Sequence, residues 1–387
     1  NQAGIGLYDH YQYINIGGTY PFGNSNNPLK VPNASLGAMP AVDRTWETIE
    51  TYNAGIDFAT LNNRLSGTFD YFIKDNKNMF YAEEFPTILG TSAPSINGAH
   101  VRTNGWELTL NWKDKIGKVG YRIGLNLSDN KTKVISLSDS RNPGHGLMGF
   151  VEGYPTNSFF IYEFDGFIKD EADLADYKTK MKGGVPTNLR VGDAKYVDKD
   201  GDGVLEPTLY KEGDLNSGDI VYKGTNNQRY LYGINLGLDW KGIDVSAFLQ
   251  GVGKWDCING TYAGGGEVWK QSSQYFYHNT WSPDRPNAEY PRLTQDGGIH
   301  GYNYQWSDAP YKFFNNRYLR LKEVQIGYTF PTTLTKKIGV EKLRVYATGM
   351  NLLEWDNLPN GFDPEAPYTE NLIPFSRTYS IGVNVQF

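Results

Sequence analysis

The chain has 387 residues with a formal net charge of −6, 14% aromatic residues, 44 glycines and a single cysteine, Cys257. The negative charge argues against nucleic-acid binding, because proteins that bind nucleic acids usually carry a basic surface. The sequence contains no apolar run near the roughly 18 residues that a transmembrane helix requires, so a helical membrane protein is excluded. A membrane-spanning β-barrel is not excluded, because its lipid-facing residues come only at every second position.

The N-terminal segment gives little structural signal. Asn1 to Leu7 lack the basic and apolar regions of an export signal, so we expect the true N-terminus of an exported protein to lie elsewhere. Asn1 to Asp43 is rich in Gly, Asn and Pro and shows little alternation of apolar and polar residues. We interpret it as part of an extracellular loop, and a proteolytic cut there is one hypothesis for where the chain begins.

Strict alternation of apolar and polar residues predicts strands, because a period of two places each set on one face. Between Tyr230 and Gln250, two alternating runs flank the tight turn Lys241-Gly242 and predict a hairpin. In chain order, nine predicted strands comprise Trp46–Ala59, Arg64–Lys74, Val101–Trp112, Val119–Asp129, the two strands of the 230–251 hairpin, Tyr318–Phe330, Leu343–Met350 and Arg377–Phe387.

The connections between these strands alternate in length. Short ones at 61–63, 113–118, 241–242 and 331–342 separate long ones, as in outer-membrane barrels, which have short periplasmic turns and long extracellular loops. With the short turns in the periplasm, the strand directions agree only if 130–228 contributes an even number of barrel strands, zero or two. We expect Phe159 to Ile168 to be one extended piece of that region.

These observations predict an all-β fold over residues 1–387, the C-terminal portion of an antiparallel transmembrane β-barrel. The chain would supply about nine to eleven strands of a 22-stranded plugged barrel, and the plug domain would be absent from it. Residues 130–228 and 252–316 would form long extracellular loop regions. An open sheet would leave unpaired backbone groups in lipid, so we expect this portion not to be stable in a membrane alone.

The final strand places five apolar residues on one face and polar residues on the other. The chain stops at an aromatic residue of the apolar face, Phe387, and such an ending looks like the signal that the outer-membrane assembly machinery reads. The alternative is an ordinary last strand of a soluble sandwich. The apolar residues are Tyr379, Ile381, Val383, Val385 and Phe387.

Several segments, in order along the chain, resemble the SusC/RagA-type TonB-dependent transporters of Bacteroidetes. They are WETIETYNAGIDF (46–58), NNRLSGTFDYF (62–72), NGWEL (104–108), YLRLKEVQIGYTFP (318–331), LRVY (343–346) and GMNL (349–352). The resemblance implies active import across the Gram-negative outer membrane. It also implies that the N-terminal part of the same transporter supplies a plug that engages TonB, and that a SusD-like lipoprotein caps the barrel. The cargo would be an oligosaccharide or a peptide.

An acidic loop carries the most specific local motif. Asp198, Asp200 and Asp202 match positions one, three and five of a calcium loop, and Gly203 would make its sharp turn. The Val204 carbonyl would supply position seven. Position twelve is Leu209 and Pro207 interrupts the loop, so Asp219 becomes the candidate for the closing ligand within 198–219. A bound Ca2+ would stiffen an extracellular loop; the alternative is a solvated acidic turn.

Aromatic residues are frequent in the second long loop. Flat rings can stack on sugar faces, so Trp255, Tyr262, Trp269, Trp281 and Trp306 are candidates for contact with the cargo or the lid. The alternative is that each ring packs within the loop or against a partner. Other tyrosines of this loop are Tyr275, Tyr277, Tyr302 and Tyr304, and Trp106, Trp112 and Trp240 near strand ends are interpreted as an interfacial girdle in lipid.

No motif favours catalysis. The five histidines are scattered and form no H-E-x-x-H pair, and the chain has no G-x-S-x-G or P-loop sequence. We therefore expect no enzyme. A passive porin or adhesin and a soluble calcium-binding carbohydrate-binding module are the alternative functions; a plug in the complete protein would contradict the first, and purification only from membranes would contradict the second.

Overall fold

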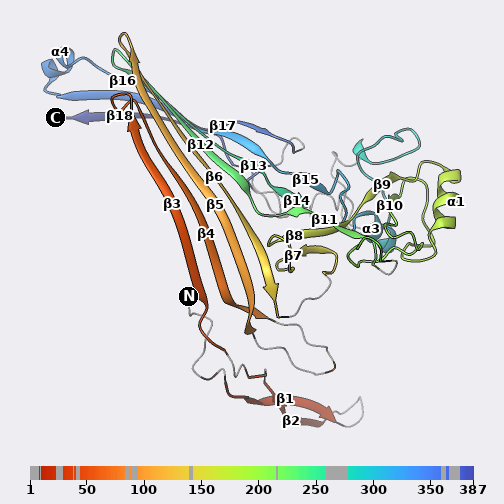
Figure 1. Ribbon diagram of the computed structural model, residues 1–387. Coiled ribbons are helices and arrows are strands. Elements are labelled where there is room, and N and C mark those ends of the chain that lie inside the picture. Colours follow the sequence, from red (N-terminus) through yellow and green to blue (C-terminus); the bar gives the residue numbers. More distant parts are fainter. Residues whose placement is uncertain are drawn as a thin grey trace.

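The computed structural model describes residues 8, 10–22, 29–37, 39–40, 44–82, 88, 95–138, 143–214, 217–258, 278–358, 363–365 and 375–387. Strands dominate it, and long strands form one curved sheet with a smaller body beside one of its ends (Figure 1). Among the described residues, no helix is both long enough and apolar enough to cross a membrane.

The large sheet, which we call the wall, is an antiparallel meander of nine strands in the order β18-β17-β16-β13-β12-β6-β5-β4-β3. The bounds are β3 Thr48–Thr60, β4 Leu65–Ala82, β5 Ser95–Ile116, β6 Val119–Leu137, β12 Arg229–Trp240, β13 Ile243–Lys254, β16 Tyr318–Thr329, β17 Lys342–Asp356 and β18 Thr378–Gln386. The nine predicted strands are confirmed. Among the described residues between β6 and β12, no strand joins the wall, so the predicted even number is zero there.

Strand register gives the wall two chemically different faces. One row across the sheet pairs Leu110 with Leu125, Leu125 with Ile234, and Ile234 with Leu249, and then continues through Leu321 and Leu353. We call this apolar side the outer face. The neighbouring row, on the inner face, is polar and consists of Thr68, Thr109, Asn126, Gly233, Gln250, Arg320 and Glu354.

Several wall strands extend beyond their predicted ends on the side of the long connections. β4 continues to Ala82, β6 to Leu137 and β17 to Asp356. These extensions alternate poorly, because polar residues lie on both faces and bulges interrupt the register between Asn76 and Met79 and between His100 and Val101. Alternation therefore marks the part of a strand that has one apolar face and misses the rest.

A hairpin precedes the wall, although the sequence predicted a loop over Asn1–Asp43. Strands β1 Ile14–Phe22 and β2 Leu29–Leu36 pair antiparallel. Their alternation is broken by a register shift between Ile16 and Gly18, where Gly17 has φ +136°. A glycine bulge of this kind changes which face each later residue occupies, so the period of two is lost from the sequence.

The smaller body, which we call the loop body, consists of described residues 143–228 and 256–316. Its elements are β7 Gly146–Met148, β8 Ser158–Tyr162, β9 Phe164–Phe167, α1 Glu171–Lys180, β10 Ala194–Tyr196, β11 Ile220–Thr225, β14 Asp256–Ile258, α3 Gly297–Asn303 and β15 Phe313–Asn315. The expected extended piece Phe159–Ile168 is split at Glu163, because β8 pairs with β7 and β11 whereas β9 pairs with β10. The Glu163 carboxylate lies between the Lys199 and Lys223 ammonium groups at 2.5 and 2.8 Å.

Unlike the wall, the loop body has a conventional core. Its fully buried side chains include Phe160, Ile168, Tyr196, Ile220 and Ile299. Asp170 caps the N-terminus of α1: its carboxylate accepts the Asp173 N–H at 2.8 Å and so satisfies a helix N–H that has no partner within the helix.

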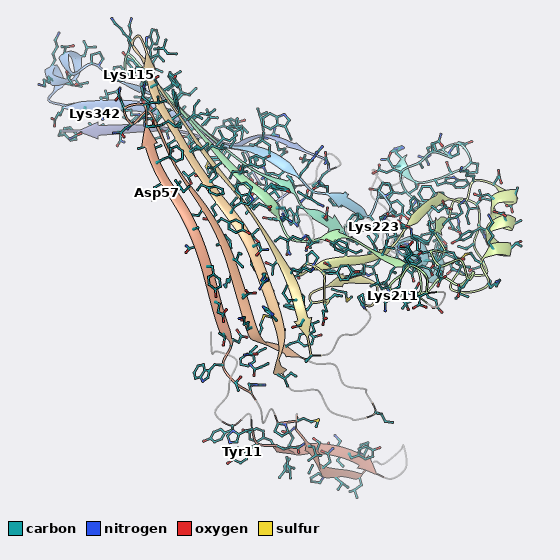
Figure 2. The ribbon with its side chains drawn as sticks, viewed as in Figure 1. Tyr11, Asp57, Lys115, Lys211, Lys223 and Lys342 are labelled. Carbon is teal, nitrogen blue, oxygen red and sulfur yellow. The ribbon has the colours of Figure 1, made fainter. Side chains whose placement is uncertain are left out.

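Backbone hydrogen bonds join the loop body to the wall at β6. The Val134 N–H donates to the Tyr154 carbonyl at 2.9 Å, and the Thr156 N–H donates to the Thr132 carbonyl at 3.0 Å. Beyond Ser128, where pairing with β12 stops, residues 153–156 therefore occupy the same edge of β6. On the opposite rim, the connection from β16 to β17 holds α4 Thr332–Thr335 and the 3-10 turn Lys336–Ile338. Lys115 and Lys342 mark this short-turn rim, and Lys211 and Lys223 mark the loop body (Figure 2).

Candidate functional site

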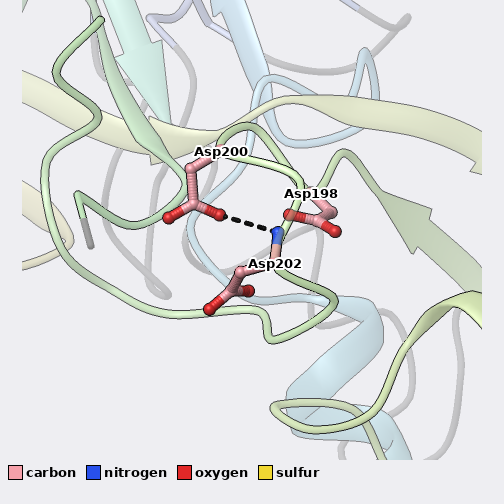
Figure 3. A group of neighbouring side chains, drawn as sticks. All are labelled: Asp198, Asp200 and Asp202. Atoms are coloured by element: carbon pink, nitrogen blue, oxygen red, sulfur yellow. Dashed lines mark hydrogen bonds between the residues drawn. The ribbon is translucent and has the colours of Figure 1, made fainter. Parts of the chain in front are cut away.

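The acidic loop brings together the three aspartates that its spacing predicted. One carboxylate oxygen from each of Asp198, Asp200 and Asp202 lies within 4.8 Å of the others (Figure 3). Their other contacts are backbone N–H groups: Asp198 accepts Gly201 and Gly203, both at 2.8 Å, and Asp202 accepts Val204 at 2.6 Å. These bonds fold the loop so that its three carboxylates share one side.

Glycine makes the turn between the third aspartate and Val204. Gly203 has φ +88°, and a Cβ there would lie 2.8 Å from the Lys180 carbonyl oxygen. The turn also ties the loop to the end of α1, because the Lys182 N–H donates to the Gly203 carbonyl at 2.6 Å. Val204 itself forms a bridge with Gly183. The chain thus holds the position-seven residue next to the triad by backbone contacts.

Asp219 is fully buried and lies outside the converging triad. Its two oxygens accept the backbone N–H groups of Lys199 at 2.5 Å and Glu206 at 2.7 Å. Burial raises the pKa of this carboxyl above its usual value, although the two N–H groups oppose the shift. In this geometry Asp219 stabilises the acidic loop through its backbone N–H groups. Its role as a closing ligand stays a prediction.

The candidate aromatic contacts lie at different depths. Trp255 is 8% exposed, and its indole N–H donates to the Asn226 side chain at 2.9 Å. Trp281 packs on Gly192, where a Cβ would come within 2.3 Å of the ring, and Trp306 packs beside Gly146 and against the cluster of Phe159, Ile161 and Ile258. Tyr262 and Trp269 lie outside the described residues, as do Tyr275 and Tyr277. Contact with cargo or a lid stays a prediction for this set.

The three tryptophans expected in an interfacial girdle are all on the outer face by register. Trp106 lies opposite Tyr71, and Trp112 lies opposite Ile123 and donates its N–H to the Tyr121 hydroxyl at 3.2 Å. Trp240 lies opposite Ile243. Trp106 and Trp112 are six residues apart on one strand, a separation of about 20 Å, and therefore sit near opposite ends of the apolar rows.

The sequence did not predict two charged groups, one of which is fully buried and the other half-buried in the fold. Arg320 is fully buried on the inner face, within 3.0 Å of Glu354, Asp363 and Glu365, and so anchors the segment 363–365 to β16. Lys312 lies over the Trp306 ring and donates to the Tyr304 carbonyl; burial lowers the pKa of its amine to about 8. Neither has a local sequence signal, because their partners are distant in the chain or come from turns.

Comparison with known proteins finds relatives by sequence and solved structures with a similar fold. The chain is 27% identical over 369 residues to TonB-dependent receptor P3 of Formosa agariphila, covering 88% of this chain and 34% of that receptor. It is 24% identical over 395 residues to TonB-dependent receptor SusC of Bacteroides thetaiotaomicron, covering 95% and 34%. The chain thus spans about a third of the length of these relatives. No family model matches it.

Among solved structures, the RagAB peptide importer in its open-open state matches with a TM-score of 0.70 at 21% identity, over 99% of this chain and 38% of that one. The RagAB peptide transporter matches with the same TM-score at 22% identity. The relatives are receptors and importers rather than enzymes, in agreement with the absence of catalytic motifs. The resemblance to SusC/RagA-type TonB-dependent receptors of the outer membrane, inferred from the sequence motifs, is therefore confirmed, and the chain has the fold of a portion of their all-β barrel.

Proposed function

We propose that the protein containing this chain actively imports a nutrient across the outer membrane of a Bacteroidetes-like bacterium. The observation that carries the proposal is the wall itself: nine antiparallel strands present an apolar outer face and a polar inner face, the arrangement of a barrel that surrounds a hydrophilic path. The likeness to SusC and to the RagAB importer supports the same function.

Within this proposal, the chain encloses cargo and does not transmit energy. The rest of the transporter supplies the plug and the remaining strands, and TonB acts through that plug. A SusD-like lipoprotein covers the extracellular side, which the loop body borders. The cargo is an oligosaccharide or a peptide, and the RagAB structures, described as those of a peptide importer, are the reason to test peptides first.

Uptake in whole cells tests the proposal. Cells with the intact gene, a deletion of the gene, or a deletion of TonB would receive labelled short peptides and oligosaccharides as sole nutrients. We expect uptake of one cargo class to require both the gene and TonB. Uptake that requires the gene but continues without TonB would instead identify a passive porin.

We further propose that the Asp198, Asp200 and Asp202 carboxylates, with the Val204 carbonyl, bind Ca2+ in the loop body. Three converging carboxylate oxygens with a glycine turn after them suit a hard cation that prefers oxygen ligands. The ion would offset the repulsion among the three carboxylates and stiffen the loop.

Calorimetric titration of the purified full-length receptor with Ca2+ tests this site. Asp200→Asn should weaken binding at least tenfold, because it removes a charged ligand. The matched control is Asp176→Asn on α1, an exposed carboxylate paired with Lys180 at 2.7 Å, which should leave binding unchanged. Equal affinity in both variants would place any bound calcium elsewhere.

A further inference from the structure

The outer face carries a charged band directly beyond the aromatic residues on the side of the long connections. Trp106 on β5 lies opposite Tyr71 on β4. Four residues beyond Tyr71, and two beyond Ile73, Asp75 lies opposite Arg102. On β6, Asp129 lies opposite Trp106, Lys131 opposite Asn104, and Lys133 opposite Arg102. No register shift intervenes between these positions, so all of them share the face of Leu125 and Leu127.

Every acid of this band already has a cation. Asp75 is 4% exposed and accepts two bonds from Arg102 at 2.8 and 3.0 Å and one contact from His100 at 2.9 Å. Asp129, 8% exposed, is bound by the Arg229 guanidinium. Glu50, opposite Asp75, is paired with Lys77 at 2.8 Å.

Two lysines remain. Lys131 and Lys133 are exposed, and among the described residues neither has a carboxylate within ion-pair distance. The band therefore has a net charge of about +2, although the whole chain carries −6. Its five cations are Arg102, Arg229, Lys77, Lys131 and Lys133, and its three acids are Asp75, Asp129 and Glu50. Excess positive charge on the lipid-facing side of an acidic protein needs a specific explanation.

The position of the two lysines along the strand, relative to the membrane, indicates what they bind. Lys131 and Lys133 follow the level of Trp106 by two and four residues, about 7 and 14 Å along the strand before tilt is considered. Aromatic residues of this kind sit at the membrane–water interface, so the two ammonium groups lie at the level of the lipid headgroups. Clusters of lysines next to a membrane-spanning segment attract anionic headgroups.

We propose that Lys131 and Lys133 bind the phosphate of an anionic glycolipid in the outer leaflet. The proposal rests on the outer-membrane orientation used in the proposed function, with the long connections outside. Asp75, Asp129 and their partners act as spacers that present no free carboxylate, and the neutral Asn104 beside Lys131 completes a surface without a competing negative charge. The lipid acyl chains would pack on the apolar rows below.

The test is native mass spectrometry of the purified full-length receptor titrated with lipid A that carries one phosphate. The variants are Lys131→Gln, Lys133→Gln and the double variant. The matched control is Lys74→Gln: Lys74 is exposed and adjacent to Asp75 in β4, but alternation places it on the inner face at the same depth. Dephosphorylated lipid A and inorganic phosphate are the two comparison ligands.

We expect about thirty-fold weaker binding in the double variant and about five-fold in each single one. Lys74→Gln should bind like the unaltered receptor, and dephosphorylated lipid A should bind as weakly to the unaltered receptor as phosphorylated lipid A does to the double variant. Equal losses in Lys74→Gln and the double variant, or no loss in either, would overturn the proposal. Displacement of the lipid by millimolar inorganic phosphate would assign the lysines to a free anion.

These outcomes are independent of import. If lipid binding is unaffected by the lysines while uptake depends on TonB, the headgroup site alone is refuted. If uptake proves passive while the lysines hold the lipid, the transport proposal alone is refuted.

Discussion

The wall and the loop body cover their apolar side chains in different ways, the wall with lipid and the loop body with a core of its own. On the wall, large apolar side chains such as Ile56, Ile326 and Ile381 are exposed by 66, 54 and 82%. In the loop body, apolar residues of the same kinds, Ile161, Ile168 and Ile220, are fully buried. The wall therefore depends on lipid to cover its apolar face, whereas the loop body makes its own interior and can be perturbed separately.

The largest expected effect is in the loop body. Phe160→Ala would remove a fully buried ring that contacts Tyr154 edge-on at 5.0 Å, and should destabilise the loop body by about 3–5 kcal/mol. Limited proteolysis of the full-length receptor would show cleavage within 143–228, while the heat-modifiable migration of the barrel stays unchanged. Phe150→Ala, at a side chain 36% exposed, is the control and should change little.

The next effect is in the wall and tests which face meets lipid. Leu125→Arg in the middle of β6 should destabilise the barrel by about 2–4 kcal/mol, because it places a charge in hydrocarbon. Asn126→Arg, one residue away on the inner face, should cost less than about 1 kcal/mol. Denaturant unfolding in lipid vesicles measures both. Similar losses from the two variants would contradict the assignment of the faces.

A smaller effect distinguishes the two regions by pH. Lys312 has a pKa of about 8 in the folded loop body, below the 10.5 of an exposed lysine. Between these values the unfolded chain binds more protons, so loop-body stability should rise with pH from 8 to 10.5 and be lowest below pH 8.

We expect a gain of about 1 kcal/mol over this window, after allowance for solvent screening. Protease resistance of the loop body at pH 7.5 and 10 measures it, with Lys312→Met as the variant that should lose this gain. A gain of the same size in Lys312→Met would assign the pH dependence to other groups.

Alternation was sufficient to predict the wall because lipid and lumen impose a period of two on nearly every strand. Where that constraint ends, prediction fails: β4 runs eight residues beyond Lys74, through the bulge at Asn76–Met79. The hairpin β1–β2 was missed for a related reason, since Gly17 resets the faces of its first strand. The wall is thus encoded locally, strand by strand.

The loop body is encoded by contacts between distant residues. The Asp198–Asp202 spacing is a local motif, and the structure brings its three carboxylates together. By contrast, the Tyr177 hydroxyl meets that of Tyr302 at 2.9 Å, 125 residues away, and Arg292 reaches Asp193 at 2.9 Å. No periodicity in the sequence indicates such pairs, so the burial of Trp255 and the partial burial of Lys312 could not be predicted from their neighbours in sequence.

The change of partner along β6 has a mechanical consequence. One edge of this strand is paired with β12 from Gly120 to Ser128 and with residues 153–156 at Thr132 to Val134, while its other edge is paired with β5. A load applied to the loop body parallel to β6 would pull on these hydrogen bonds in shear, in which several must break together, rather than one after another as in unzipping. The loop body is therefore rigidly attached to the wall. A force that an external partner exerts on the loop body would be transmitted along β6 to its short-turn end.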